Sequence, residues 1–246
     1  MHNSAIKSLG LNACYIRTPI IDGNGIIDTF KALKLDGANV TVPHKESAYK
    51  LCDKLSEIAT NIGAVNTLVK KEDKIVGFNT DAPGFYRSIE SFDNIKTALI
   101  LGAGGTAKAI SYILNLHEIK TTILNRSKER LDIFSKNGFE TFCWEDFEKK
   151  EYDIIINTTT AGLKDEIFPL DEYLLCELMD SARYAFDVIY GKTTPFLKLA
   201  NIKKLLFKDG SDMLLHQASI AFNLFYDKRF ELDEIENFMI KVMNLS

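Results

Sequence analysis

The sequence predicts an α/β protein with two lobes, and three observations support this fold class. Short β-rich segments alternate with amphipathic helical patterns from the start of the chain, which is typical of a mostly parallel sheet covered by helices. A second and more regular series of the same kind begins after Asn94, and the chain ends in two helical segments. At 246 residues and 46% hydrophobic composition, the chain is long enough to form two modest domains.

The first series predicts a small α/β lobe. Its alternating elements are a helix over 3–9, a strand over 11–17, a helix over 26–33 and a strand over 38–42. A hairpin follows, with strands over 64–70 and 75–79. Asp81 then precedes Ala82-Pro83, which predicts that its carboxylate caps a helix running to Ser91.

The second series predicts a doubly wound parallel sheet. Its elements are strands over 97–101, 120–125, 152–157, 184–189 and 203–207, with helices over 106–116 and 128–136. The helices expected over 211–226 and 232–243 pack back on the first lobe. We therefore expect one domain made of residues 1–81 and 211–246 and a second domain over 82–210.

Composition and charge exclude several classes of function. The chain has 30 basic and 34 acidic residues and a net charge of -4, so it lacks the basic excess that nucleic-acid binding requires. No apolar run approaches the roughly 20 residues of a membrane span, and no export leader is recognisable, which predicts a cytoplasmic protein. The four cysteines and four histidines are scattered without metal-site spacing, so we expect no metal.

A glycine-rich loop predicts a dinucleotide site in the second domain. The segment Gly102-Ala103-Gly104-Gly105-Thr106-Ala107 follows a buried strand and opens a helix, in the pattern GxGxxA. The first glycine permits a tight turn, the second lets the backbone approach a pyrophosphate, and the small Ala107 lets helix and strand pack closely. The helix N-terminus would face the anion with unpaired N–H groups. Methyltransferases and plain structural turns share this loop, so the pattern alone is weak.

The end of the next strand favours NADP as the cofactor. An NAD-binding fold carries an acidic residue there, about 20 residues after the loop, to bind the ribose 2′-OH. This chain instead has Asn125-Arg126-Ser127, with Arg130 one turn later. A guanidinium fork suits a 2′-phosphate. A solvated arginine after a strand is the alternative interpretation.

Lys45 and Asp81 are the candidate acid–base groups of the first domain. A lysine beside a carboxylate in a partly desolvated site can transfer a proton and hold a hydroxyl. Lys45 follows Asn39-Val40-Thr41-Val42-Pro43-His44, and taken alone it also fits a solvated residue in the first turn of a helix. Asn66 suits binding of substrate hydroxyls or the tying down of a strand edge, and Gln217 suits either a substrate or a polar contact in the core.

Eight motifs together give a more specific hypothesis. In chain order they are NVTVPHK (39–45), GAVNT (63–67), GFNTDAPG (77–84), GAGGTA (102–107), NRSKER (125–130), INTTTAG (156–162), DVIYGKTTP (187–195) and GSDMLLHQASIAF (210–222). They arrive in the order found in the quinate/shikimate dehydrogenase family, and they span nearly the whole chain. The sequence therefore resembles the shikimate dehydrogenases of that family.

The resemblance implies a fold, a reaction and a set of residues. It implies a substrate domain, a Rossmann domain that binds NADP, and reversible reduction of 3-dehydroshikimate in chorismate and aromatic amino-acid biosynthesis. Lys45 and Asp81 would be the catalytic pair. The shikimate pocket would be lined by Thr41, Lys45, Asn66, Asp81, Tyr190 and Gln217. The cofactor would be bound by Gly102, Ala103, Gly104, Gly105, Thr106, Ala107, Asn125, Arg126, Ser127, Arg130, Val188 and Gly210.

The resemblance leaves some alternatives open. The family begins with a strand and a serine-containing substrate loop of the form SxSPxMHN, and this sequence starts at the MHN of that motif. We therefore expect sequence upstream of Met1. A quinate/shikimate enzyme that prefers NAD and a non-catalytic dinucleotide-binding module are the other hypotheses. The sequence is compatible with a monomer or a homodimer.

Overall fold

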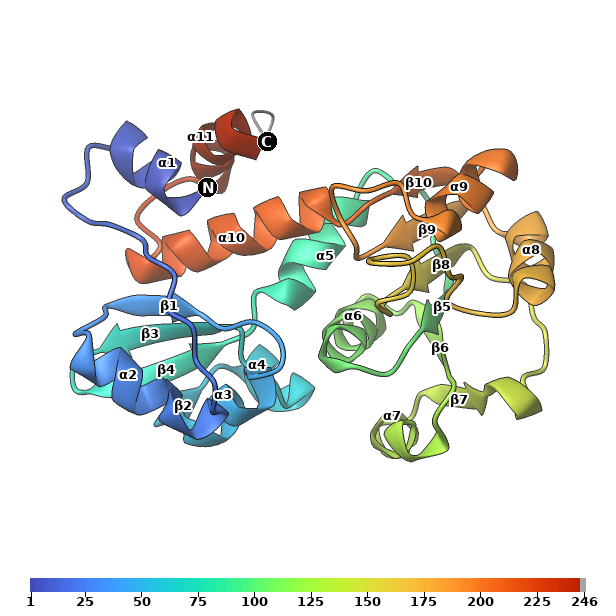
Figure 1. Cartoon of the computed structure of the whole chain (residues 1–246), viewed down its shortest axis with the longest axis horizontal. Coiled ribbons are helices and arrows are strands. Elements are labelled where there is room, and N and C mark those ends of the chain that lie inside the picture. Colours follow the sequence, from blue (N-terminus) through green and yellow to red (C-terminus); the bar gives the residue numbers. More distant parts are fainter. Residues whose placement is uncertain (244–246) are drawn as a thin grey trace. The chain divides into compact units, whose positions relative to one another are not determined.

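The structure is a computed structural model that describes residues 1–243 and contains two compact units (Figure 1). Unit 1 combines residues 1–87 with the chain from Leu214 onward, and unit 2 spans residues 88–213. The predicted assignment of substrate binding to residues 1–81 and 211–246, and of cofactor binding to 82–210, stays a prediction. Within the described part of the chain, no helix has the length and apolar character needed to cross a bilayer.

Unit 1 contains a four-stranded mixed sheet. Its strands, in the order β1-β3-β4-β2, are β1 (Gly37–Asn39), β3 (Thr67–Lys71), β4 (Lys74–Phe78) and β2 (Lys54–Leu55). The predicted hairpin is confirmed, because β3 and β4 pair in antiparallel register from Thr67 opposite Phe78 to Lys71 opposite Lys74. The last residues before β3 and after β4 thus lie at one end of the hairpin.

Three short helices cover this sheet and close its core. They are α2 (Ile26–Ala32), α3 (Lys45–Leu51) and α4 (Glu57–Ile62), and a 3-10 turn η1 (Gly23–Gly25) precedes α2. Ile26 and Phe30 of α2 pack with Ala48 of α3 and with Leu68 and Ile75 of the hairpin. The apolar spacing of α2 therefore faces the sheet, as helical periodicity predicts.

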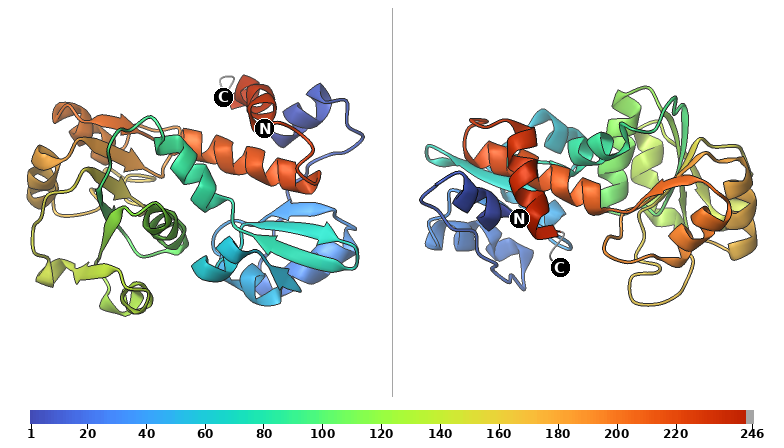
Figure 2. Two further views of the ribbon diagram at one scale, coloured as in Figure 1. Left: turned by 180° about the vertical axis from the view of Figure 1, so that it is seen from behind. Right: turned by 90° about the horizontal axis from the view of Figure 1, so that it is seen from above.

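A helical cluster forms the rest of unit 1. It consists of α1 (His2–Ser8), α11 (Leu232–Met243) and, from Leu214 onward, α10 (Ser211–Phe225), and α1 and α11 lie side by side in both views of Figure 2. Ile6 of α1, Phe222 of α10 and Met239 of α11 share one apolar core. A further helix, α5 (Asp81–Ile89), starts three residues after β4. The C-terminal helices thus return to the first unit, as predicted.

Unit 2 contains a six-stranded parallel sheet. Its strands, in the order β10-β9-β8-β5-β6-β7, are β10 (Leu206–Lys208), β9 (Tyr184–Asp187), β8 (Ile154–Asn157), β5 (Thr97–Leu101), β6 (Lys120–Asn125) and β7 (Glu140–Cys143). Strand order reverses at β5, which pairs in parallel with β6 on one side and β8 on the other. A doubly wound sheet of this kind binds ligands outside the carboxyl ends of the strands at that switch point.

Helices cover both faces of the parallel sheet. They are α6 (Gly105–Leu116), α7 (Asp132–Lys136), α8 (Glu172–Ser181) and α9 (Pro195–Ile202), with the 3-10 turns η2 (Lys128–Arg130) and η3 (Trp144–Asp146). Figure 1 shows α6 and α8 on opposite faces. Strands buried on both faces have continuous apolar sequences, and Ile154, Ile155 and Ile156 of β8 are fully buried.

One predicted element does not form, and some of the observed elements were not predicted. The strand expected over 11–17 does not form: the segment is irregular, and the Asn3 side chain bonds both the N–H and the C=O of Tyr15, at 2.7 and 2.8 Å. A side chain thus takes the bonds that a neighbouring strand would make. Strand β7 and helices α8 and α9 were not predicted. In contrast, β5 and β6 have the predicted boundaries at both ends.

Candidate active site

Lys45 and Asp81 form an ion pair in unit 1. Lys45 Nζ lies 2.6 Å from Asp81 Oδ2, and the two side chains are 15% and 9% exposed. Lys45 is the first residue of α3 and Asp81 the first residue of α5, so two helix starts place the charges. A charge pair this close and this buried is attractive because water screens it weakly. The sequence named both residues, and the structure brings them together.

The start of α5 differs from the prediction. Asp81 was expected to cap this helix, but the Asn79 side-chain oxygen accepts from the backbone N–H groups of Asp81 and Ala82, at 3.1 and 3.3 Å. The prediction that Asp81 is the cap is therefore wrong. Because Asn79 satisfies these N–H groups, the Asp81 carboxylate is available for Lys45 and Asn66.

Asn66 binds the other oxygen of the same carboxylate. Its Nδ2 donates to Asp81 Oδ1 at 2.8 Å and also lies 3.0 Å from Thr80 Oγ1. Asn66 directly precedes β3, and Thr80 directly precedes Asp81, so the open end of the hairpin carries all three residues. Asn66 is 2% exposed. Its burial beside an ionised pair fits a structural and a substrate-binding role alike.

Gln217 and Thr41 occupy less constrained places in unit 1. Gln217 lies on α10, where Nε2 donates to the Leu214 carbonyl of its own helix at 3.0 Å. A Cβ atom on Gly84 of α5 would lie 2.7 Å from Gln217 N, so the absence of a side chain there lets α10 approach α5. Thr41 is exposed after β1, and its carbonyl accepts from the N–H of His44 at 3.0 Å.

The glycine loop of unit 2 has the backbone that a pyrophosphate needs. Gly102 follows β5 with φ +107°, which favours glycine, and a Cβ atom there would lie 2.7 Å from Thr158 Oγ1. Gly104 and Gly105, at the start of α6, face open space, and no side chain caps this helix. Ala107 is fully buried, which permits the close packing of helix and strand. These features fit a phosphate at the helix N-terminus.

The turn after β6 presents two guanidinium groups. Asn125 ends β6, and its side chain donates to the Ser127 carbonyl at 2.8 Å, which fixes the turn. Arg126 and Arg130 are exposed, and within residues 1–243 no carboxylate is seen to pair with either of them. The positive charges are thus available to an anion, and the acidic residue of an NAD-type site is absent.

Val188 and Gly210 lie against each other at the ends of β9 and β10. A Cβ atom on Gly210 would lie only 2.2 Å from the Val188 carbonyl oxygen, so only glycine fits this contact. The structure thus brings together the two residues predicted near the nicotinamide. Tyr190, predicted to bind substrate, lies in the same loop with its side chain 53% exposed.

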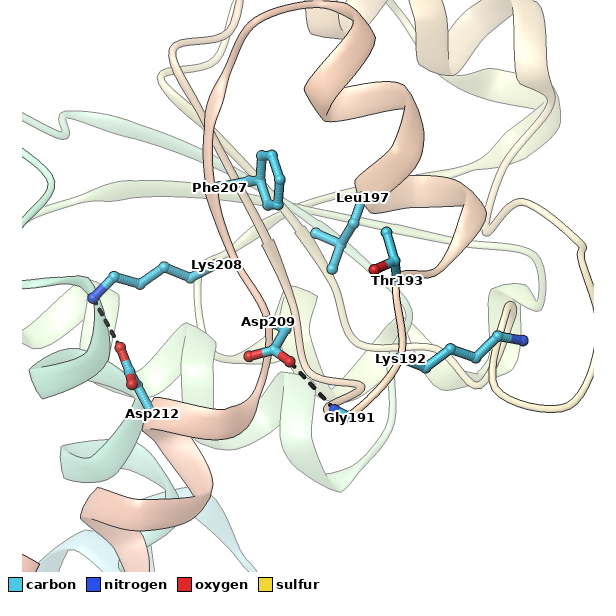
Figure 3. Close-up of a pocket in the computed structure, with 8 residues that line it drawn as sticks. All are labelled: Gly191, Lys192, Thr193, Leu197, Phe207, Lys208, Asp209 and Asp212. Carbon is cyan, nitrogen blue, oxygen red and sulfur yellow. Dashed lines mark hydrogen bonds and ion pairs between the residues drawn. The ribbon is translucent and has the colours of Figure 1, made fainter. Parts of the chain in front are cut away.

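A pocket of 510 Å³ lies beside this loop in unit 2 (Figure 3). None of the predicted site residues lines it, although the residues that follow Tyr190 and precede Gly210 do. Lys208 pairs with Asp212 at 3.0 Å, and Asp209 accepts from Gly191 N at 3.3 Å. The full lining is Gly191, Lys192, Thr193, Leu197, Phe207, Lys208, Asp209 and Asp212. One pair of opposite charges in the pocket wall, Lys208 and Asp212, is thus already neutralised.

Metal-binding side chains do not gather anywhere in the described part of the chain. Among residues 1–243, no three His, Cys, Asp or Glu side chains are arranged to hold an ion.

Comparisons with known proteins agree with this geometry. Residues 1–68 match the sequence family described as the shikimate dehydrogenase substrate binding domain. The chain is 45% identical to the shikimate dehydrogenase (NADP(+)) of Helicobacter hepaticus over 251 aligned residues, which cover 99% of this chain and 93% of that protein.

The fold matches solved structures of the same enzyme. The shikimate 5-dehydrogenase of Thermus thermophilus, in complex with NADP(H) and shikimate, has a TM-score of 0.83 and 31% identity, covering 98% of this chain and 92% of that one. The enzyme of Listeria monocytogenes, in complex with shikimate and NAD, has a TM-score of 0.82 and 30% identity, covering 97% and 90%.

The chain belongs to the shikimate dehydrogenase family. The two-domain α/β architecture with a Rossmann-like parallel sheet is therefore confirmed. The predicted roles of individual site residues stay predictions.

Sequence reasoning missed one buried residue that shapes the loop expected to meet the cofactor. Asp187 ends β9 and is fully buried. Its carboxylate accepts from Thr194 Oγ1 at 2.6 Å, Ile189 N at 3.0 Å and Asn157 Nδ2 at 3.1 Å. Burial raises its pKa, and the three hydrogen bonds oppose that rise. The residue was visible in DVIYGKTTP, but only the fold reveals its three donors.

Proposed function

We propose that this chain interconverts 3-dehydroshikimate and shikimate with NADP as the cofactor, with Lys45 and Asp81 as the catalytic pair. The observation that carries the proposal is the 2.6 Å contact between these two charges, in a family of shikimate dehydrogenases. This reaction belongs to the pathway that supplies chorismate and the aromatic amino acids.

Lys45 supplies the proton in the proposed reaction. NADPH, when bound, would supply a hydride to the carbonyl carbon, and the ketone oxygen must gain a proton to become a hydroxyl. The Lys45 ammonium donates that proton, and the Asp81 carboxylate holds Nζ in place and accepts from the same hydroxyl. In the oxidation direction Lys45 takes the proton back. A positioned group of this kind accelerates a reaction by roughly 10²- to 10⁴-fold.

The remaining predicted residues of unit 1 would bind the substrate hydroxyls. Asn66 would present the NH₂ group that donates to Asp81 Oδ1, and Thr41 and Gln217 would extend the polar surface. Gln217 would exchange its bond to the Leu214 carbonyl for one to the substrate. The substrate-binding role of Tyr190, which the resemblance implies, belongs to the same proposal.

The glycine loop and the arginine turn of unit 2 would hold NADP. The open space at Gly104 and Gly105 fits the pyrophosphate, since a side chain would fill it. Asn125, Ser127 and the guanidinium groups of Arg126 and Arg130 would bind the 2′-phosphate. The chain would work in the cytoplasm as a monomer or a homodimer.

The deciding experiment measures NADPH formation from shikimate and NADP. The wild-type protein should reduce NADP, and Lys45→Ala should lower turnover by roughly 10² to 10⁴. Lys50→Ala is the matched control, because Lys50 lies on the same helix and is exposed. Near-normal turnover of Lys45→Ala would remove Lys45 from the mechanism. NADP binding by a wild-type protein without shikimate oxidation would instead favour a dinucleotide-binding module.

The NAD-preferring alternative is tested with the same enzyme. Rates with NADP and NAD at saturating shikimate separate the two hypotheses. A higher kcat/KM with NAD would overturn the choice of cofactor while leaving the reaction in place.

A further inference from the structure

A chain of side-chain hydrogen bonds leads from the N-terminal segment of unit 1 to the Asp81 carboxylate. Its members are Tyr15 and His2, then Asn39 of β1, Thr67 of β3, and Asn66. Thr67 is fully buried and Asn66 is 2% exposed. None of the roles assigned above accounts for Thr67, although it lies in direct contact with Asn66.

Only one of the two possible orientations of the Asn39 side-chain amide satisfies its neighbours. Its Oδ1 lies 3.0 Å from both His2 Nε2 and Tyr15 Oη. Burial, opposed by the bond to Asn39, lowers the pKa of His2 to about 4, so the ring is neutral near pH 7 and has one N–H. His2 Nδ1 has no partner among the described residues, which places the proton on Nε2, where Asn39 accepts it. Asn39 Nδ2 therefore faces Thr67 Oγ1, at 3.1 Å.

The hydrogen bond from Asn39 determines how the Thr67 hydroxyl bonds to Asn66. A hydroxyl has a single proton, and an incoming bond from Asn39 Nδ2 leaves that proton free to point elsewhere. Thr67 Oγ1 lies 3.0 Å from Asn66 Oδ1 and 3.3 Å from Thr80 Oγ1. The contact with Asn66 is the shorter of the two, and its acceptor is an amide oxygen. Thr67 therefore donates its proton to Asn66 Oδ1.

The oxygen of the Asn66 amide is thereby surrounded by donors. Besides Thr67, it accepts from the Thr80 N–H at 2.8 Å and lies 3.2 Å from Thr80 Oγ1. A flipped amide would place its NH₂ against the Thr80 N–H, which has no acceptor to offer. The NH₂ of Asn66 must then face Asp81 Oδ1, which leaves Asp81 Oδ2 for Lys45.

We propose that Thr67, oriented by Asn39, is a positioning residue that acts with the Thr80 N–H to fix the direction of the Asn66 amide and, through it, the orientation of the Asp81 carboxylate toward Lys45. The catalytic consequence rests on the proposed dehydrogenase function, whereas the orientation of the amide does not. Hydrogen bonds in such a buried chain polarise one another, so removal of the Thr67 hydroxyl should also weaken the hydrogen bond between Asn66 and Asp81.

The test compares two substitutions of Thr67. Thr67→Val keeps the shape and removes the hydroxyl, while Thr67→Ser keeps the hydroxyl and removes a methyl group. In metal sites, substitution of a residue that orients a metal ligand through a hydrogen bond lowers activity by roughly 10- to 100-fold. We expect a loss of kcat of that order in Thr67→Val, at an unchanged NADP dissociation constant, and recovery to within about threefold in Thr67→Ser.

The matched control is Thr122→Val in unit 2. Thr122 is also buried in a strand, and its hydroxyl also bonds a side chain, Glu140, at 2.8 Å. A kcat near that of the wild type is expected for this variant. If loss of a buried threonine hydroxyl acts only through general stability, Thr122→Val and Thr67→Val should lower kcat alike, and that result overturns the proposal.

A second substitution tests the direction of the chain. Asn39→Asp keeps the acceptor for Tyr15 and His2 but replaces the donor to Thr67 with another acceptor, which draws the Thr67 proton away from Asn66. We expect Asn39→Asp to lower kcat about as much as Thr67→Val, and the double variant to be no worse than either single variant. Additive losses would mean that the two residues act separately.

A spectroscopic readout separates this inference from the function itself. The side-chain NH₂ resonances of Asn66, assigned by their absence in Asn66→Asp, should shift and exchange faster with solvent in Thr67→Val and stay in place in Thr67→Ser. An unchanged Asn66 signal in Thr67→Val overturns the positioning role. If the wild-type protein does not oxidise shikimate, the proposed function fails, and the resonances still decide whether Thr67 orients Asn66.

Discussion

The charge of Arg126 is the residue-level feature that we expect to distinguish between the two nicotinamide cofactors. It lies in the turn after β6 with its side chain exposed, and the Asn125 side chain bonds the Ser127 carbonyl to hold that turn. A dinucleotide with a 2′-phosphate has two more negative charges there than one with a free ribose. The guanidinium fork can bind such a phosphate through two parallel bonds.

Arg126→Ala should therefore weaken the binding of NADP while leaving the binding of NAD nearly unchanged. Loss of a charge-assisted bond to a phosphate corresponds to roughly a 10- to 100-fold rise in KM for NADP, with a change of less than about twofold for NAD. Steady-state kinetics with both cofactors at saturating shikimate measure this. Lys128→Ala, an exposed lysine two residues further on, is the control. Equal rises in KM for both cofactors would show that Arg126 does not contact a 2′-phosphate.

At this scale the sequence predicts functional residue types better than it predicts their partners. Lys45 and Asp81 could be named because their motifs are dense in polar residues. The role of Asn79 as the cap of α5 could not be predicted, since Asn79 and Asp81 are both good capping residues two positions apart. The positions of Thr67 and Asn39 depend on strand pairing, because Asn39 lies opposite Thr67 only in the observed register.

At the scale of elements, one buried carboxylate joins three helices of unit 1. Glu236 of α11 lies 2.9 Å from an Arg87 guanidinium nitrogen of α5, 3.0 Å from His216 Nδ1 and 2.7 Å from Ser219 Oγ, both of α10. Burial alone would raise the Glu236 pKa, but the bonds from His216 and Ser219 and the neighbouring charges outweigh it, so this pKa lies below its usual value.

Glu236→Gln should destabilise the fold and alter its acid sensitivity. A carboxyl whose pKa is lower in the folded state stabilises it above the unfolded pKa of about 4.3, and this contribution is lost as the pH falls through the folded value. We expect the substitution to lower the free energy of unfolding by roughly 1 to 3 kcal/mol at pH 7, and less at pH 3. Urea unfolding at both pH values measures the difference.

The control for this prediction lies on the same helix. Glu234 of α11 is exposed, so Glu234→Gln should change the free energy of unfolding by less than about 0.5 kcal/mol at either pH. If Glu236→Gln destabilised the protein equally at pH 7 and pH 3, the packing of the side chain and not its charge would be responsible.

Elements were predictable where the apolar pattern is long and the boundaries are marked. Strand β5 ends at Leu101, directly before Gly102, and strand β6 ends at Asn125, and both buried runs were located to the residue. Residues 11–17 have a similar β-rich composition, yet they form no ladder, because a strand forms only where a neighbouring strand takes up its backbone hydrogen bonds. Strand β7 was missed because its residues are only half buried and its apolar pattern is short.

On the scale of the whole molecule, each unit has a core of its own. In unit 1, Phe30, Ala48 and Leu68 belong to the core beneath the mixed sheet. In unit 2, Leu99 and Ile155 belong to the core that α8 and α9 cover. Units with separate cores can open separately, and a ligand that binds only one of them stabilises that one.

Hydrogen exchange should therefore report the two ligands in different parts of the chain. A ligand at about 100 times its dissociation constant stabilises the state that binds it by about 2.7 kcal/mol, which slows exchange through opening of that unit by about 100-fold. NADP should slow exchange in β5 and β8, and shikimate should slow it in β3 and β4. Arg126→Ala, at the same NADP concentration, should reduce the first effect without changing the second. Equal protection of all four strands by NADP alone would mean that the chain opens as one cooperative unit, and protection of β3 and β4 by NADP but not of β5 would contradict the assignment of the cofactor to unit 2.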